Sequence, residues 1–362
     1  MSLKIYAVGD IMLGEQLLCN NFGVKKIIQK NGTDYLFEEV IPLFRDGDIV
    51  FGNLECSFMK RNSKTDGKSF FFFADPDIVK GLKNAHFNVL SVANNHVMEN
   101  GREYFINTIQ ILKDNGITPV GIKKKYDLIN IKGHRIAFLA YSFIEDSISN
   151  TCYNKVQSEN TIIEDIRNVK RVSDFIIVSL HWGCEYVPYP SPDQIQIGRK
   201  FVDAGADTIL GGHPHVTQGF EIYKDRPIIY SLGNFIFDLT FIPPTNESFI
   251  AEINIGDSPG SIKVNIIPFL INMHTYRPQL LEGSQKDTFL KNVSLSSNLF
   301  ENRSLSEYLV TIGDYNILHN NKKQAAKWNM KIQFTKNFYR YSFLTFCNIL
   351  KQYIGKQKRE LD

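Results

Sequence analysis

Residues 211–238, GGHPHVTQGFEIYKDRPIIYSLGNFIFD, decide how this chain folds and where its chemistry lies. The stretch follows a short apolar run at residues 208–210, which is typical of a buried strand. His213 and His215 stand two positions apart just after that run, so both imidazoles can point toward one centre and share a metal ion. We therefore interpret the stretch as the last edge of a metal site assembled from several strand ends.

Other apolar runs of the chain also end in polar residues that can bind a metal ion. The runs cover residues 3–8, 48–51, 88–92 and 174–180, and the polar residues after them are Asp10, Asn53, Glu55, Asn94, Asn95, His96 and His181. Helical patterns lie between the runs, for example at residues 101–115 and 194–204. Alternating strands and helices predict right-handed crossovers and mostly parallel strands. Open sheets of this kind hold their sites at the carboxyl ends of the strands.

The pattern changes in the second half of the chain. Short runs there look like β-strands joined by turns with no helix between them, at residues 228–232, 248–255 and 263–270. This change predicts a second, largely antiparallel sheet packed on the first. The expected fold is therefore α/β, a four-layer α/β/β/α sandwich with a C-terminal helical tail. We expect one domain over residues 1–275 and a basic, partly helical extension over residues 276–362.

The end of the chain is basic and aromatic. From Asn321 onward it carries ten Lys or Arg residues and two acidic ones, and residues 338–353 read FYRYSFLTFCNILKQY. One interpretation is a terminal helix that docks its apolar face on the core. The alternative is a basic amphipathic helix that lies on an anionic membrane.

Composition and charge limit the class of protein. The chain has 362 residues, 43% of them hydrophobic and 22% charged, which is ordinary for a globular protein. Its formal net charge of +3 predicts no nucleic-acid partner. The five cysteines are scattered and form no CxxC pair, which favours free thiols in a reducing compartment. The sequence has no signal-peptide pattern and no run of about 18 apolar residues. We expect a cytoplasmic protein, with attachment to the inner membrane surface as the alternative.

The polar residues at the strand ends form a mixed set of metal donors. The set consists of Asp10, Asn53, Glu55, Asn95, His96, His181, His213 and His215. Carboxylates, imidazoles and amide oxygens together suit one or two divalent ions such as Mn, Fe or Zn, whereas a structural zinc site would use cysteine. Such ions lower the pKa of a water molecule and polarise a phosphoryl or carbonyl oxygen. His96 can then donate a proton to the leaving group, and Glu99, three residues further on, can orient its ring.

Structural roles remain open for some of these residues. Asp10 follows a strand and can instead cap a helix that begins near Gly14. Asn94 and Asn95 can simply be turn residues, because asparagine side chains bond to the backbone of a turn. The metal interpretation is stronger for the two histidines after residue 210, because several other strand ends supply donors as well.

Six motifs follow one another along the chain. They are GDIMLG at 9–14, NLE at 53–55, ANNHVMENG at 93–101, HWGCEY at 181–186, GGHPHVTQGFE at 211–221 and YSLGNFIFD at 230–238. In order and spacing they resemble the CapA family, which is linked to capsule and poly-γ-glutamate synthesis, and the resemblance covers residues 3–270. That family is similar to the calcineurin-like metallophosphatases, which implies the four-layer sandwich and a site for one or two metal ions.

The resemblance also implies roles for single residues. His96 matches the catalytic histidine of the phosphatases. The matched metal ligands are Asp10, Asn95, His181, His213 and His215, with Asn53 or Glu55 at the position of the bridging carboxylate. Two positions depart from the pattern. Metallophosphatases usually have histidine where Met12 stands, and the family usually has aspartate where Glu99 stands.

Three hypotheses for the function follow. The first is a metal-dependent hydrolase of a phosphoester or γ-glutamyl amide, acting in the biosynthesis or processing of a capsular or related cell-surface polymer. The second is a polymer-binding or assembly component of a capsule-synthase membrane complex without catalytic activity. The third, a small-molecule phosphodiesterase, rests on fold analogy alone. The residues predicted to bind the polymer or its precursor are Trp182, Glu185, Tyr186 and Asn234.

Overall fold

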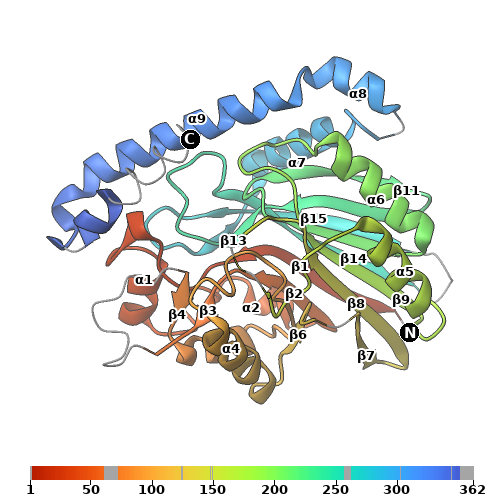
Figure 1. The fold of residues 1–362 in the computed structure, drawn as a ribbon, viewed down its shortest axis with the longest axis horizontal. Coiled ribbons are helices and arrows are strands. Elements are labelled where there is room, and N and C mark those ends of the chain that lie inside the picture. Colours follow the sequence, from red (N-terminus) through yellow and green to blue (C-terminus); the bar gives the residue numbers. More distant parts are fainter. Residues whose placement is uncertain are drawn as a thin grey trace.

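Two β-sheets packed face to face form the centre of the fold (Figure 1). The computed structural model describes residues 2–60, 72–123, 125–146, 148, 150–256, 262–301, 303–343 and 345–350. One sheet has eight strands and the other has six, and helices cover their outer faces. A separate pair of short strands, β3 (Ser57–Phe58) and β4 (Phe73–Ala74), lies outside both sheets.

The eight-stranded sheet is parallel in one half and antiparallel in the other. Its strand order is β16-β15-β14-β1-β2-β5-β6, with β13 paired to β1. β1, β2, β5 and β6 run parallel, whereas β14, β15 and β16 are added antiparallel beyond β1. The strands are β1 (Leu3–Ile11), β2 (Ile49–Leu54), β5 (Val89–Ser91), β6 (Thr118–Val120), β13 (Asn234–Ile236), β14 (Glu247–Ile255), β15 (Ile262–Ile271) and β16 (Pro278–Leu280).

The six-stranded sheet has a parallel centre and antiparallel edges. Its strand order is β11-β12-β10-β9-β8-β7. The central strands β8, β9, β10 and β12 run parallel, and the edge strands β7 and β11 run antiparallel to their neighbours. The strands are β7 (Asp127–Ile131), β8 (His134–Ser142), β9 (Phe175–His181), β10 (Thr208–Gly212), β11 (Thr217–Tyr223) and β12 (Arg226–Leu232).

Helices cover the outer face of each sheet and complete the four layers. Buried residues of the helices on the eight-stranded sheet join its core cluster, and these helices are α1 (Val24–Asn31), α2 (Ile41–Phe44), α3 (Val79–Asn84) and α4 (Arg102–Asp114). The six-stranded sheet is covered by α5 (Glu159–Val169) and α6 (Pro192–Ala204), whose apolar faces form a second cluster with it. Short 3₁₀ turns are η1 (Leu17–Cys19), η2 (Pro76–Ile78) and η3 (Phe338–Arg340).

The local sequence sets both ends of α6. Ser191 Oγ accepts a hydrogen bond from Gln194 N at 3.1 Å, while Gln194 Oε1 accepts one from Ser191 N at 2.8 Å, which is a capping box. Pro192 occupies the first turn, where a missing N–H is tolerated. The helix ends before Gly205, whose φ of 124° is easy for glycine. A Cβ on Gly183 would lie 2.6 Å from Gln194 Oε1, so the start of α6 lies against the loop that follows β9.

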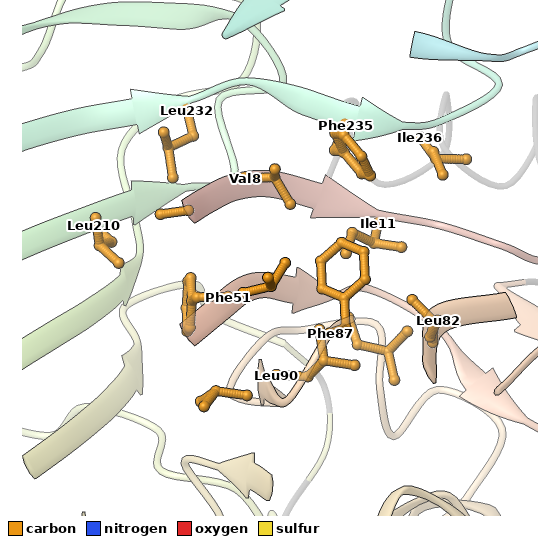
Figure 2. Packing of buried hydrophobic residues seen from close by; sticks show 14 of the residues in the cluster. Val8, Ile11, Phe51, Leu82, Phe87, Leu90, Leu210, Leu232, Phe235 and Ile236 are labelled. Atoms are coloured by element: carbon orange, nitrogen blue, oxygen red, sulfur yellow. The ribbon is translucent and has the colours of Figure 1, made fainter. Parts of the chain in front are cut away.

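The core between the sheets comes from the parallel strands of both. Figure 2 shows Val8 and Phe51, from β1 and β2, in one cluster with Leu210 and Leu232, from β10 and β12. The rings of Phe51 and Phe138 stack across the interface with their centroids 5.9 Å apart. Burying each side chain of this kind contributes roughly 1.5–3 kcal/mol. This packing holds the two sheets, and therefore their strand ends, in one relative position.

The four-layer sandwich and each strand expected from the sequence are confirmed, but the expected division of strands between the sheets is wrong. The runs at 174–180 and 208–210, expected in the same mostly parallel sheet as β1, are β9 and β10 of the six-stranded sheet. The run at 228–232, expected in an antiparallel sheet, is β12 and lies parallel to β10. β14 and β15 extend the sheet of β1 instead. Periodicity shows that a strand is buried, but the choice of neighbour depends on contacts between distant segments.

The C-terminal extension packs on both sheets. β16 pairs with β15, and the extension continues in helices α7 (Gly283–Ser297), α8 (Leu305–Ile312) and α9 (Tyr315–Asn337). Phe300 and Tyr308 lie in the core cluster of the six-stranded sheet. Figure 1 shows α9 crossing one side of the molecule toward the segment that carries α1. The domain boundary at residue 275 stays a prediction.

Beyond α9 the chain docks on residues near the N-terminus. Tyr341 and Ile349 are buried against Leu17, and the Tyr341 hydroxyl donates a hydrogen bond to Leu18 O at 2.9 Å. Part of the tail therefore does dock on the body of the protein. Within the aromatic run at 338–353, residues 344 and 351–353 lie outside the described residues. No helix in the described part of the chain has both the length and the apolar character needed to cross a membrane.

Candidate metal centre

The donors expected from the sequence lie together where parallel strands of both sheets end. From the eight-stranded sheet, β1 carries Asp10, β2 carries Asn53 and leads into Glu55, and β5 leads into Asn95 and His96. From the six-stranded sheet, β9 ends at His181, and β10 leads into His213 and His215. The strand ends within each sheet are level, because Asp10 pairs in register with Asn53 and Gly212 pairs with His181.

Asp10, Glu55 and His181 form a first cluster. One ligand atom of each lies within 4.8 Å of the others, and all three side chains are buried. Asn53 Nδ2 donates a hydrogen bond to Asp10 Oδ1 at 2.8 Å, and Asn95 Oδ1 lies 2.9 Å from His181 Nε2. Two carboxylates, an imidazole and a nearby amide oxygen suit a hard or borderline divalent ion.

The surroundings of Glu55 fit a cation. Its side chain is 0% exposed, and neither carboxylate oxygen has a hydrogen-bond partner among the described residues. His96 Nε2 and His181 Nε2 lie 3.6 and 3.7 Å from its Oε1. Burial raises the pKa of this carboxyl well above its usual range, and the negative charge of Asp10 raises it further. Burying an unpaired carboxylate costs several kcal/mol, so a cation held here would offset that cost.

Glu185, His213 and His215 form a second cluster, again with one ligand atom of each within 4.8 Å of the others. It adjoins the first cluster at Asp10. His213 N donates a hydrogen bond to Asp10 Oδ2 at 3.0 Å, and His215 Nδ1 lies 3.5 Å from the same oxygen. The two clusters therefore make one continuous set of donors with the Asp10 carboxylate at the junction.

Asn234 orients the ring of His215. Asn234 Nδ2 donates a hydrogen bond to Thr245 O at 3.1 Å, so its Oδ1 faces His215 Nδ1, 2.9 Å away. With Nδ1 bonded in this way, Nε2 is the atom left to bind an ion, as is common for metal-binding histidines. Asn234 is itself buried, and its expected contact with substrate stays a prediction.

Burial and charge set the protonation of the donors. Burial disfavours the charged form of Asp10, but a hydrogen bond from His215 and the charge of His181 outweigh it and lower the pKa of Asp10 to about 2. Burial also disfavours the imidazolium of His215, yet Glu55 and Asp10 raise the pKa of that ring to about 10. In contrast, burial lowers the pKa of His213 to about 4. A metal ion bound at His215 would displace the proton of its ring.

His96 lies at the edge of the first cluster. Its Nδ1 is 2.9 Å from Glu99 Oε1, and its ring stacks on Phe72 with the centroids 3.9 Å apart. Glu99 is thus in the place expected of a residue that orients His96, and this role stays a prediction. Phe72 was not expected from the sequence, because no local signal connects it with a histidine 24 positions further along.

Hydrogen bonds of the Asn94 side chain fix the conformation of the loop after β5. Its Oδ1 accepts a hydrogen bond from His96 N at 3.2 Å, and its Nδ2 donates one to Asn53 Oδ1 at 3.1 Å. The turn interpretation therefore applies to Asn94, whereas Asn95 faces His181. The hydrogen bond between Asn94 and Asn53 ties the ends of β5 and β2 together.

Two residues expected to bind substrate are largely buried. Trp182 Nε1 donates a hydrogen bond to Tyr230 O at 2.9 Å, and the two rings stack. The ring centroid of Tyr186 lies 6.3 Å from that of His215. Both side chains support the histidine loops from within the protein, while Glu185 is partly exposed. Contact of Trp182 and Tyr186 with a polymer stays a prediction.

Two glycines allow the ends of the two sheets to meet. A Cβ on Gly211 would lie 1.9 Å from a backbone oxygen of β12, and a Cβ on Gly212 would lie 2.7 Å from Asp10 Oδ1. Just beyond them, His213 and His215 have φ values of 93° and 58°, which strain residues other than glycine. Proteins hold such strain mainly at functional sites. The consecutive glycines before the histidines were a visible sequence signal for this close approach.

Comparison with known protein families shows which family the chain belongs to. The family model described as the bacterial capsule synthesis protein PGA_cap matches residues 4–239, which is well over half of the chain and includes both clusters. This chain belongs to that family. Within the family it is 33% identical, over 293 residues, to the capsule biosynthesis protein CapA of Bacillus anthracis, covering 76% of this chain and 69% of the relative. The resemblance to CapA proteins is confirmed.

Another relative and a solved structure extend the comparison. The chain is 31% identical over 303 residues to the PGA biosynthesis protein CapA of Bacillus subtilis (strain 168), covering 80% of this chain and 77% of that one. The crystal structure of 5'-nucleotidase from Candida albicans SC5314 is 13% identical, with a TM-score of 0.45, over 81% of this chain and 57% of that chain. The fold described above follows from the strand order of this chain itself and not from that comparison.

Proposed function

We propose that this CapA-family chain is a metal-dependent hydrolase acting in the synthesis or processing of a capsular or poly-γ-glutamate-type polymer. The names of its relatives, capsule and PGA biosynthesis proteins, support the polymer context. The observation that carries the chemistry is Glu55, a fully buried carboxylate with no hydrogen-bond partner among the described residues. The bond to be cleaved is a phosphoester or a γ-glutamyl amide, since each offers an oxygen that a cation can polarise.

The proposed metal site draws on donors from both sheets. The ions are Mn, Fe or Zn, one or two in number, and the residues that would hold them are Asp10, Glu55, His181, His213 and His215, with Asn53 and Asn95 beside them. Such an ion, when bound, polarises the substrate oxygen and makes a water molecule more acidic.

His96 is placed to transfer a proton to the leaving group. Glu99 Oε1 lies 2.9 Å from His96 Nδ1, so this carboxylate is placed to orient the ring. His96 Nε2 lies on the side of the first cluster, 3.6 Å from Glu55 Oε1. Phe72 covers one face of the ring and shields it from water. In this arrangement His96 Nε2 protonates the leaving oxygen or nitrogen while the scissile bond breaks.

Metal content and hydrolysis test this proposal together. Purified full-length protein, reconstituted with Mn, Fe or Zn, is expected to retain one or two metal equivalents by plasma mass spectrometry. It is also expected to cleave a chromogenic phosphoester or a γ-glutamyl anilide. The His213→Ala/His215→Ala variant is expected to lose metal and activity, while His274→Ala, an exposed histidine outside both clusters, keeps them. Wild-type protein that binds no metal after reconstitution would contradict the proposal.

A non-catalytic role at a membrane-bound synthase complex is the second candidate. The observation that favours it is a set of aromatic residues near the C-terminus, here called the aromatic strip, each exposed over more than half of its surface: Trp328, Phe338, Tyr339 and Phe343. Lys327, Lys331, Lys336 and Arg340 lie beside these rings in the sequence. Exposed rings among basic residues are typical of segments that bind anionic membranes.

Vesicle flotation tests the second candidate. The chain is expected to float with vesicles that contain anionic lipid and to stay behind with vesicles of neutral lipid. A Trp328→Ser/Tyr339→Ser/Phe343→Ser variant is expected to lose flotation, while Leu295→Ser, a change at an exposed apolar residue of α7, is not. Equal recovery on both kinds of vesicle would count against membrane docking through this strip.

A further inference from the structure

The loop that follows β9 brings a carboxylate to the two histidines that follow β10. Glu185 lies in this loop, and its ligand oxygen lies within 4.8 Å of the ligand atoms of His213 and His215. Neither the strand-end pattern nor the matched ligand set includes this residue, which the sequence suggested only as a substrate contact. We propose that Glu185 is a metal ligand and that, with His213 and His215, it makes a second cation site beside the Asp10–Glu55–His181 cluster. The inference deepens the proposed function and rests on it.

Backbone hydrogen bonds hold the two loops together on both sides of Glu185. Trp182 N donates to Gly212 O at 3.1 Å, and Tyr186 N donates to Pro214 O at 2.8 Å. Between these two bonds the chain turns sharply, with φ values of 84° at Gly183 and 66° at Tyr186. The loop is therefore built around the histidine loop, which keeps Glu185 next to both rings.

The C-terminal helices brace the same loop from the other side. The Tyr308 hydroxyl donates a hydrogen bond to Pro190 O at 2.7 Å, and the Tyr315 hydroxyl donates one to Tyr189 O at 3.4 Å. Tyr308 belongs to α8 and Tyr315 begins α9. A glutamate that only touched solvent would need no such support, whereas a metal ligand must be held near its productive position.

A buried nitrogen at this cluster lacks a partner. His213 is 6% exposed, and its Nδ1 has no hydrogen-bond partner among the described residues. Buried polar atoms are nearly always paired, so an imidazole nitrogen without a partner in a residue of this cluster is consistent with a missing ligand. A cation between His213, His215 and Glu185 supplies what this nitrogen lacks.

Met12, although it follows the same strand end as Asp10, is not a suitable ligand for these ions. It is fully buried, and its Sδ accepts a hydrogen bond from Gly14 N at 3.2 Å. A thioether is a soft donor that suits Cu(I) better than Mn, Fe or Zn. Glu185 supplies an anionic oxygen and gives the second site three protein ligands.

The two sites then differ in the ions they prefer. Two imidazoles and one glutamate form the ligand set of several catalytic zinc sites, with a position left for water or substrate. The first cluster offers two carboxylates and one imidazole with amide oxygens beside them, a harder set that suits Mn. Zinc is therefore expected to occupy the Glu185 site and manganese the Glu55 site.

Zinc titration of the metal-free, full-length protein tests the inference. Calorimetry is expected to give two equivalents for wild-type protein, and Mn added first is expected to block only one of them. Glu185→Gln is expected to retain one equivalent and to bind the other at least about 100-fold more weakly, because a ligand is lost rather than an outer contact. Cys184→Ala, in the same loop but outside both clusters, is the matched control and keeps both equivalents.

Each outcome separates the inference from the proposed function. Glu185→Gln that binds both zinc equivalents with unchanged affinity overturns the role of Glu185 and leaves the hydrolase proposal standing. Wild-type protein that binds no zinc or manganese overturns the hydrolase proposal itself. Circular dichroism of the metal-free variant checks the fold. If Glu185→Gln does not fold, Glu185→Asp decides, because its shorter arm is expected to weaken the second zinc at least tenfold.

Discussion

The two sheets contribute different sets of donors to the candidate metal centre. The eight-stranded sheet supplies the carboxylates Asp10 and Glu55, while the strands of the six-stranded sheet lead into the imidazoles of His181, His213 and His215. Each set alone leaves buried groups unsatisfied, namely the Glu55 oxygens in one and a His213 nitrogen in the other. The comparison shows that the first cluster depends on sheet packing, because Asp10 and Glu55 come from one sheet and His181 comes from the other, whereas the donors of the second cluster all follow strands of the six-stranded sheet.

Removing the charge of Glu55 is expected to have the largest effect on metal binding and activity. Glu55→Gln keeps the shape of the side chain but removes its charge, so the first cluster is expected to lose its ion. Activity is then expected to fall on the order of 1,000-fold, as when an electrostatic partner of the reacting atoms is lost. Metal analysis and initial rates check this, and a Glu55→Gln protein with full metal content would refute the central place of this carboxylate.

The same variant is expected to change how stability depends on pH. The pKa of Glu55 in the folded chain is raised above its usual 4.5. Above that pH the unfolded chain releases this proton while the folded chain retains it, so the metal-free wild type loses stability relative to Glu55→Gln as the pH rises. Thermal unfolding in chelator at pH 4.5 and pH 7.5 measures the difference. A difference in stability between the two proteins that stays constant from pH 4.5 to pH 7.5 would contradict the raised pKa of Glu55.

A change at His96, the proposed proton donor, is expected to lower activity without changing metal binding. His96→Ala is expected to lower kcat by about 100-fold or more while metal content stays unchanged, since general acids typically contribute factors of this size. Glu99→Gln is expected to cost less, about tenfold, because it only orients and stabilises the ring. Rates on substrates with good and poor leaving groups provide the readout. An equal loss on both kinds of leaving group would mean that His96 does not act as the acid.

The packing between the sheets can be weakened without touching a donor. Leu210→Ala removes a buried side chain next to Phe51 and Leu232, and it is expected to cost about 2–5 kcal/mol of unfolding free energy. Leu295→Ala, at an exposed leucine of α7, is expected to change stability by less than about 0.5 kcal/mol. Denaturant unfolding measures both. If the centre depends on sheet packing, metal affinity falls in the first variant and not in the second.

Loss of an orienting contact is expected to have the smallest effect. Asn234→Ala frees the ring of His215 and is expected to weaken one metal equivalent by about tenfold, leaving the other unchanged. Asn265→Ala, an exposed asparagine on β15, serves as the control. Zinc titration gives both affinities, and an unchanged Asn234→Ala protein would show that His215 is oriented by its other contacts.

Much of the fold and the donor set could be predicted because the signals are local. Each buried apolar run predicts a strand, and the polar residues just after it mark the end of that strand, which is how Asp10 and His181 could be recognised as candidate donors. The division of strands between sheets could not be predicted, because it depends on pairings such as β1 with β14 between residues far apart in the chain. Local periodicity is the same in either sheet.

The parts of the site that escaped prediction are those made by contacts between loops. Phe72 meets His96 only in the folded chain, and Glu185 meets His213 only because Tyr186 bonds to Pro214. Motif reading could name Glu185 as a nearby residue but could not tell a substrate contact from a ligand. That distinction needs the distances between side chains.

The bare backbone at Gly211 and Gly212 has a consequence for reading other sequences. A methyl group at Gly211 would meet backbone atoms of β12, and one at Gly212 would press on the Asp10 carboxylate. A homologous chain with a larger residue at either position could keep both sheets, but the backbone of β12 or the carboxylate at the position of Asp10 would have to move. These two positions can therefore be checked in other sequences. A sequence that retains both glycines has the space for a metal centre, whereas one with larger residues there is expected to keep the fold without the centre.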